Sequence, residues 1–280
     1  MVEKILFWLD AGFIQFGIAK FLQNIVDVKF FAIIDTNEGK EFFKNQKFVN
    51  FSKIWFYRDC LTLNKKTDME FLVDFEKKYN LNLWKIIYSD VHFNKYNKFY
   101  KFKIEEILPI IEQEIKCYEQ ILNEIKPDFL IIRTTDYAKN QILHQICKAR
   151  NIPILMLGHS RLGKKCIITT ESDLWDEHQK TSQLEKSKEF SLEELQSNLK
   201  IYSKSQKNMI KTYQSSSVSK ILAALYFVLH VTKTEYRKYY EHKGWSINNM
   251  IKNEIDIFFQ KRFRKRFIDK NSTKELKVNE

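Results

Sequence analysis

The chain has 280 residues, of which 44% are hydrophobic and 29% are charged, so it can bury a sizeable core as one large domain or two small ones. Lys and Arg outnumber Asp and Glu, giving a formal net charge of +12 and a pI near 9.3. This excess favours an anionic partner, which could be a nucleic acid, a nucleotide or sugar phosphate, or an acidic membrane surface.

The cysteines and the apolar runs argue against several classes of protein. The apolar runs at 4–9 and 221–231 are too short for a signal peptide or a membrane span. The cysteines have no C-x-x-C spacing and no nearby His, which argues against a zinc site or a disulfide framework. We therefore expect a cytoplasmic protein with reduced thiols at four scattered positions: Cys60, Cys117, Cys147 and Cys166.

Roughly the first 170 residues alternate strand-like and helix-like segments, the signature of an α/β domain with a parallel sheet. Strands are expected at 4–10, 28–36, within 47–59, at 129–136 and at 152–157. Helices are expected at 13–25, 38–46, 69–80, 104–125 and 137–151.

The expected helix at 104–125 is the longest. Its apolar residues recur with helical spacing from Ile104 to Ile125, and Lys126-Pro127-Asp128 ends it. Pro109 should kink this helix or mark its true first turn.

Three regions follow from this pattern. Residues 1–175 are expected to form a Rossmann-like α/β domain, in which a parallel sheet is flanked by helices. Residues 176–268 contain no strand-like run and are expected to form a helical region with a basic arm. Residues 269–280 are expected to be a disordered tail.

A near-match to a phosphate-binding P-loop occurs at Gly158-x-x-x-x-Gly163-Lys164, after an expected strand. A P-loop needs Ser or Thr next, to hold magnesium, and then a helix. Here Lys165 follows, and 166–173 is β-branched and typical of a strand or loop. We therefore reject a P-loop.

In an open parallel sheet, ligands bind beyond the carboxyl ends of the strands. Three expected strand-end loops carry polar residues: Asp10-Ala11-Gly12, Arg133-Thr134-Thr135-Asp136 and 158–163. In the first loop, Gly12 would let a phosphate or sugar approach the helix. Arg133 in the second loop and Arg161 in the third would clamp an anionic group between them. The general-base candidates are Asp136 in the second loop and His159 in the third.

Plainer roles stay open for the same residues. Gly12 could serve only a tight turn, and Asp136 could cap a helix starting at Tyr137. Arg133 could be an ordinary surface or ion-paired residue, and His159 a solvated loop histidine.

Two segments carry a resemblance to a known family. The first is a long helix running into Pro127-Asp128 and the hydrophobic strand 129–132, and the second is "ARNIPIL" at 149–155 followed by Ser160-Arg161-Leu162-Gly163. Together they resemble the N-terminal halves of capsule or surface polysaccharide biosynthesis proteins, which are glycosyltransferases of the GT-B fold. The basic arm "FFQKRFRKRF" at 258–267 is similar to the one that leads into the second domain of that family.

The resemblance implies an acceptor-side domain for sugar transfer from a nucleotide-sugar to a glycan or a lipid-linked acceptor. It adds Asp10 as a third candidate base and places Ser160 and Gly163 in the substrate-binding loop. The donor-binding second domain of that family is expected to be missing here, so activity would need a second domain or a partner chain. No Asp-x-Asp motif occurs, and neither a metal nor a cofactor is expected.

Two other classes of function stay open: a non-catalytic binding or adaptor module, and a basic protein that binds nucleic acid or a membrane surface. In the arm, Phe258, Phe259, Arg262, Phe263 and Arg266 share a helical face. The plainest interpretation is a solvated basic helix packed through its phenylalanines. Docking to an acidic membrane at the inner face comes next, and nucleic acid last. The cations available for such docking are Arg262, Arg264, Lys265 and Arg266.

Overall fold

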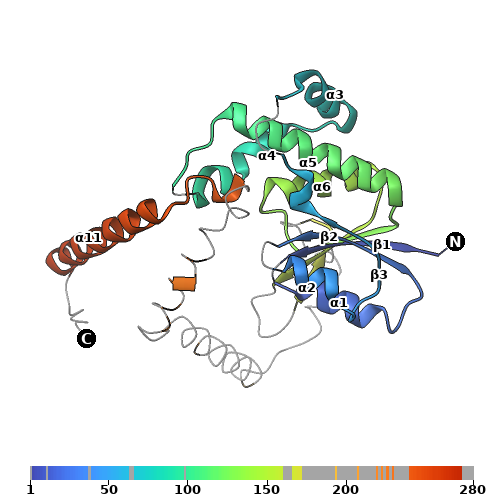
Figure 1. Ribbon diagram of the computed structural model, residues 1–280, viewed down its shortest axis with the longest axis horizontal. Helices are drawn as coiled ribbons and strands as arrows, with labels where there is room; N and C mark the ends of the chain where they lie inside the picture. The colour runs from blue at the N-terminus through green and yellow to red at the C-terminus, as the bar shows by residue number, and fades with distance from the viewer. Residues whose placement is uncertain are drawn as a thin grey trace. The chain divides into compact units, whose positions relative to one another are not determined.

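The computed structural model (Figure 1) describes residues 2–10, 12–36, 39–62, 66–97, 99–159, 166–171 and 240–272, together with a few isolated residues between 193 and 229. The chain forms two compact units. The first comprises Met1–Tyr96 with Phe102–Lys220, and the second comprises Asn97–Lys101 with Ile221–Glu280. Each unit is described by itself below.

The first unit is an α/β layer structure around a six-stranded sheet with the order β3-β2-β1-β4-β5-β6. All neighbouring strands pair in parallel except β5 and β6, which are antiparallel. The expected α/β class and mostly parallel sheet are confirmed by this strand pairing. The expected helical C-terminal region is confirmed by α11 (Ile247–Asn271). The strands are β1 (Lys4–Asp10), β2 (Lys29–Asp35), β3 (Phe51–Phe56), β4 (Phe129–Ile132), β5 (Ile154–His159) and β6 (Cys166–Thr169).

Helices cover both faces of the sheet, with α1 and α2 on one face and α5 and α6 on the other (Figure 1). The chain passes outward from β1 to β2 and β3, then crosses back through α3, α4 and α5 to place β4 on the other side of β1. The helices are α1 (Ile14–Leu22), α2 (Lys40–Asn45), α3 (Met69–Tyr79), α4 (Leu83–Ser89), α5 (Ile104–Ile125) and α6 (Ala138–Ala149). Single turns lie at η1 (Tyr57–Cys60) and η2 (His92–Tyr96).

Strand β1 is the centre of the core because it is buried on both faces. On one face Phe7 contacts Phe30 of β2, and this layer continues into Ala19 of α1 and Phe43 of α2. On the other face the ring of Trp8 packs against other aromatic residues, with its centroid 5.5 Å from that of Tyr57 and 6.1 Å from that of Tyr118 on α5. A strand buried on both faces needs a continuous apolar run, which is the pattern read from 4–9.

The turn between α5 and β4 holds β4 against β1. Lys126 ends α5 in the left-handed conformation, with φ 47°. Asp128 then exchanges hydrogen bonds with Lys4: its carboxylate accepts from the Lys4 backbone N–H at 2.8 Å, and its own N–H donates to the Lys4 carbonyl at 2.9 Å. The segment Lys126-Pro127-Asp128 therefore ends the helix, as expected, and also sets the register of the next strand.

Helix α5 begins before Pro109, which lies inside it, so this proline does not mark the first turn. Three adjacent polar residues on α5 are buried, a feature that the apolar spacing did not indicate: Glu112, Gln113 and Glu114. Each holds the segment between β3 and α3. Glu112 accepts from the Asp68 N–H at 2.8 Å, Gln113 accepts from the Thr62 N–H at 2.6 Å, and Glu114 accepts from the Tyr57 hydroxyl.

Cys60 of η1 and Cys117 of α5 form a disulfide, so the expectation of reduced thiols throughout the chain is wrong for this pair. Their Cα atoms are 6.0 Å apart, within the range that a disulfide spans. Sequence spacing could not show this, because the two positions meet only when η1 folds back over α5.

In the second unit, the segment 97–101 packs against the turn before α11 (Ile247–Asn271). The Asn97 side-chain amide donates to the Lys243 carbonyl at 2.9 Å, and the rings of Phe99 and Trp245 meet edge to face. Gly244 has φ 79°, and a Cβ there would lie 2.6 Å from the Phe99 carbonyl oxygen, so only glycine fits.

One expectation for the C-terminal region changes. α11 continues to Asn271, so the start of the tail expected at 269–280 is helical. Residues 273–280 lie outside the described part of the chain, as does most of 172–239. In the described part of the chain, no helix is long and apolar enough to cross a membrane.

We predict that reducing the Cys60–Cys117 disulfide destabilises the protein. Its sequence separation of 57 residues corresponds to about 4 kcal/mol of unfolding free energy in the chain-entropy model, which engineered bridges often do not reach. Urea unfolding of the wild type should shift on adding reductant, whereas that of Cys117→Ser should not. Peptide mapping should also find Cys147 unreactive, because burial raises its pKa to about 12. If reductant did not shift the wild-type unfolding curve, and if Cys60 were alkylated without reductant, the disulfide would be contradicted.

A second prediction concerns Glu119 on α5, which pairs with Lys78 at 2.6 Å and Arg150 at 3.4 Å. Burial alone would raise the pKa of Glu119, but the hydrogen bonds from Lys78 and Tyr79 outweigh it and lower the pKa from its ordinary 4.5. A lowered carboxyl pKa contributes stability above about 4.5 that is lost as pH falls through the folded-state pKa.

Glu119→Gln should therefore lower the free energy of unfolding by roughly 1–2 kcal/mol at neutral pH, and the deficit should shrink toward zero in acid. Urea unfolding across this pH range measures it. Glu124→Gln, which removes an exposed pairing with Lys53, is the matched control and should have little effect at any pH. A deficit for Glu119→Gln that stays constant with pH would contradict the assignment.

Candidate functional site

Three of the residues selected from the sequence meet where β1 and β4 end. Asp10 is the last residue of β1, Gly12 follows it, and Arg133 follows β4. The Asp10 carboxylate accepts the Gly12 backbone N–H at 2.8 Å and lies 3.5 Å from the Arg133 guanidinium. Both charged side chains stay partly exposed, at 26% for Asp10 and 36% for Arg133. A ligand could therefore reach this pair.

This group lies at the topological switch point of the sheet. The chain leaves β1 toward β2 on one side and later returns to β4 on the other, so the loops after β1 and β4 diverge there. Open α/β sheets bind ligands in the crevice outside the carboxyl ends of such strands. We take Asp10, Gly12 and Arg133 as the centre of the candidate site.

The local backbone explains why position 12 is a glycine. The left-handed residue of this turn is Phe13, with φ 56°, and α1 starts only at Ile14. A Cβ on Gly12 would lie 2.9 Å from Asp10 Oδ1 and 3.2 Å from an Arg133 nitrogen. Gly12 is thus required by the close approach of the Asp10–Arg133 pair, rather than by an unusual φ of its own.

A buried ion pair lies beside this group. Asp35, at the end of β2, is the register partner of Asp10, and its carboxylate lies 2.7 Å from Lys139 Nζ and 3.9 Å from Arg58 Nε. The side chains of Asp35 and Lys139 are only 9% and 5% exposed. The Lys139 ammonium also lies over the rings of Tyr57 and Tyr137. Two adjacent strand-end carboxylates are therefore each neutralised by their own cation.

Several buried polar atoms near the ends of these strands have no hydrogen-bond partner among the described residues. They are both amide atoms of Gln15 in the first turn of α1, Asp35 Oδ1, and Asn140 Oδ1 in the first turn of α6. Such atoms are rare in folded proteins and call for a water, an ion or a ligand. On α5, burial and the nearby charges of Glu114 and Asp35 raise the pKa of Tyr118 well above its ordinary value, so its hydroxyl stays neutral.

The other residues selected from the sequence fall elsewhere. Thr134 is half-buried after Arg133, and Asp136 is exposed. Asp136 does not cap α6, because Tyr137 is its N-cap residue and Asp90 accepts the Ala138 N–H at 2.5 Å. His159 ends β5, but its side chain is outside the description. The predicted binding residues Ser160, Arg161 and Gly163 also lie outside the described residues.

Sequence reasoning missed Lys139, Arg58, Gln15 and Asn140. For Lys139 a signal was present: a cation in the first turn of a helix is opposed by the helix dipole, so it implies a nearby carboxylate. Gln15 gave a weaker signal, as a polar residue between the apolar positions of α1. Arg58 and Asn140 carry no local signal, because their burial depends on elements distant in sequence.

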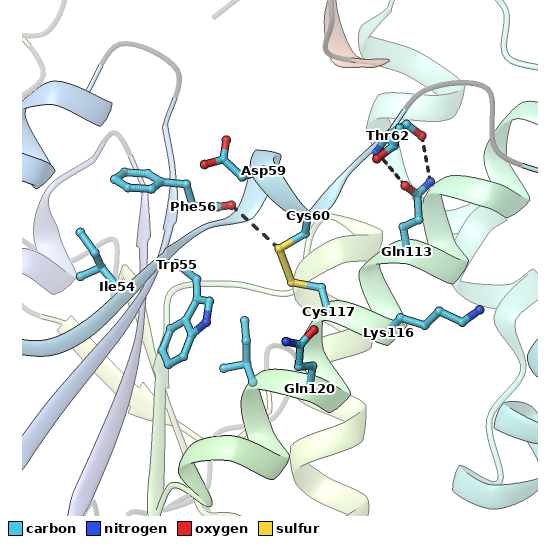
Figure 2. A pocket seen from close by; sticks show the side chains of 11 residues that line it. Ile54, Trp55, Phe56, Asp59, Cys60, Thr62, Gln113, Lys116, Cys117 and Gln120 are labelled. Carbon is cyan, nitrogen blue, oxygen red and sulfur yellow. Dashed lines mark hydrogen bonds between the residues drawn. A yellow bond between two sulfur atoms is a disulfide. The ribbon is translucent and has the colours of Figure 1, made fainter.

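A cavity of about 760 Å³ opens at the other side of η1, between β3 and α5 (Figure 2). Trp55, Gln120 and the Cys60–Cys117 disulfide line it. Most of its polar groups already bind protein atoms: Gln113 binds Thr62, Asp59 pairs with Lys40, and Lys116 pairs with Glu112. It contains none of the residues at the switch point. We therefore place the candidate site at the switch point and not in this cavity.

Comparison of the chain with protein-family models and with curated proteins finds no match. Among the described residues, no group of three or more His, Cys, Asp or Glu side chains is arranged to hold a metal ion.

We predict that the Asp35–Lys139 pair is required for stability. Lys139→Met should lower the free energy of unfolding by about 3–5 kcal/mol, because it leaves Asp35 buried without its closest cation. The exposed Lys53–Glu124 pair supplies the control, and Lys53→Met should cost less than about 1 kcal/mol. Urea unfolding measures both. Adding Asp35→Asn to Lys139→Met should recover part of the loss, and equal effects of the two lysine variants would refute this role.

Proposed function

We propose that the first unit is the acceptor-side domain of a GT-B-type glycosyltransferase of capsule or surface polysaccharide biosynthesis. The observation that carries this proposal is the grouping of Asp10, Gly12 and Arg133 at the switch point between β1 and β4. The strand order and the sequence resemblance of 127–132 and 149–163 support it, as does the net charge of +12. The substrates would be a nucleotide-sugar and a glycan or lipid-linked acceptor.

Asp10 suits the role of general base. In an inverting transfer, a carboxylate takes the proton from the acceptor hydroxyl as that oxygen bonds to the anomeric carbon, and the bond from this carbon to the diphosphate breaks. Asp10 is accessible, and the Gly12 N–H and Arg133 fix its orientation. Asp136 is also exposed, but the described part of the structure gives it no contact with Gly12 or Arg133.

Arg133 suits the binding of an anionic group. Its contact with Asp10 runs through one terminal nitrogen, and a guanidinium carries five N–H donors in a planar fork. The remaining donors can bind a phosphate bidentately while the contact with Asp10 is kept. Positive charge here would stabilise a leaving diphosphate without a metal ion.

Two substitutions test this function. Asp10→Asn keeps the shape of the side chain but removes the base, so sugar transfer should fall by roughly 10²–10⁴-fold while substrate binding is largely kept. Arg133→Ala should instead weaken nucleotide-sugar binding by about tenfold or more. The measurements are isothermal titration with UDP-, GDP- and CMP-sugars, and transfer of labelled sugar to glycan and lipid-linked acceptors. Both are made with the chain complemented by a donor-binding second domain or partner chain.

Lys53→Ala, on edge strand β3, is the control and should change neither quantity, since Lys53 lies away from the switch point. Unfolding curves of the variants should stay close to that of the wild type. If none of these nucleotide-sugars binds to the complemented protein, or if binding and transfer are unchanged by both site substitutions, the proposed function is wrong.

A further inference from the structure

The C-terminal half of α11 carries exposed aromatic rings and exposed cations side by side. Phe259, Phe263 and Phe267 are 53%, 64% and 70% exposed. Among the described residues, these phenylalanines are therefore exposed rather than packed. Five exposed cations occupy the same stretch, and no acidic residue lies between Phe258 and Ile268. They are Lys261, Arg262, Arg264, Lys265 and Arg266.

The spacing places three of these rings in one row along the helix. Each step of four residues advances about 40° around a helix, so the rings at 259, 263 and 267 fall within about 80° of one another. The five cations fall on the remaining circumference, together with the exposed side chains of Phe258 and Ile268. Arg266 borders the row, about 20° from Phe259. An apolar aromatic row bordered by a Lys- and Arg-rich face is the pattern of helices that lie in a membrane interface.

The base of α11 is held by contacts within its own unit. Ser246 caps the helix by accepting the Asn249 N–H at 3.1 Å, and the Asn249 amide donates to the Gly244 carbonyl at 2.8 Å. The segment 97–101 packs against the same turn through Phe99 and Trp245. These contacts fix the start of the helix and leave the rings further along it exposed.

We propose that the segment 258–268 of α11 docks the protein onto an anionic lipid membrane surface. The phenylalanines would enter the interface between headgroups and acyl chains, while the cations would pair with lipid phosphates. A second copy of this chain is a poorer occupant, because it would bring two strongly cationic segments together. Nucleic acid would engage the cations but would leave a continuous apolar row only partly used.

This inference does not depend on the sugar chemistry, and its test reads lipid binding alone. Full-length protein is sedimented with vesicles of phosphatidylcholine, with and without phosphatidylglycerol. We expect binding only to the anionic vesicles, weakened by added salt because salt screens the charges. Phe259→Ala/Phe263→Ala/Phe267→Ala should weaken binding by at least about tenfold. So should Arg262→Gln/Arg264→Gln/Lys265→Gln/Arg266→Gln, through the lost charge.

The matched control is Phe21→Ala/Ile25→Ala/Phe48→Ala, which removes three equally exposed apolar side chains from the first unit and should bind as the wild type does. Alanine and glutamine are good helix formers, so circular dichroism should show no loss of helix in either α11 variant. Arg133→Ala should keep vesicle binding, and the α11 variants should keep nucleotide-sugar binding, which separates this inference from the proposed function.

Three outcomes would overturn the inference. Equal binding to neutral and anionic vesicles would remove the role of the cations. Tighter binding to single-stranded oligonucleotides than to anionic vesicles would assign α11 to nucleic acid. Self-association that the phenylalanine variant abolishes, without any vesicle binding, would assign it to a second copy of the chain.

Discussion

Parallel pairing of β1 with β2 on one side and with β4 on the other is the constraint on which the first unit depends. It brings the carboxyl ends of three strands to one edge and places Asp10 directly opposite Asp35. Two adjacent carboxylates repel each other unless each is compensated. The cations Arg133, Lys139 and Arg58, which come from three different segments, are therefore a consequence of the strand register.

The two carboxylates are compensated in different ways, and this separates their roles. Asp35 and Lys139 are almost fully buried, so their pairing holds α6 against β2 and contributes mainly to structure. Asp10 and Arg133 are further apart and partly exposed. The exposed parts of these two side chains can bind a ligand while their mutual contact is kept. Asp35 and Lys139 cannot give up their contact for a ligand, because either charge would be left without its closest partner.

Much of the fold followed from residue pattern alone. The buried strand at 4–10 and the helix at 104–125 were predictable because apolar periodicity and the Lys126-Pro127-Asp128 stop are local signals. The strand expected at 129–136 starts where predicted but ends at Ile132. The site was partly predictable, because parallel strands bring Asp10, Gly12 and Arg133 to one edge whatever their sequence separation. Burial of Glu112–Glu114 and the Cys60–Cys117 disulfide were not, because both arise when η1 and the segment after it fold over α5.

The segment that starts at η1 also helps to position the charged side chains at the polar edge of the sheet. Tyr57 packs on Trp8 and donates to Glu114, so it fixes η1 against both the sheet and α5. Its neighbour Arg58 is thereby held close to Asp35. The Tyr57 ring also lies under the Lys139 ammonium. Asp59 and Cys60 face the cavity on the other side. One turn of the chain thus separates a charged edge that can receive a ligand from a cavity whose polar groups are largely engaged by the protein itself.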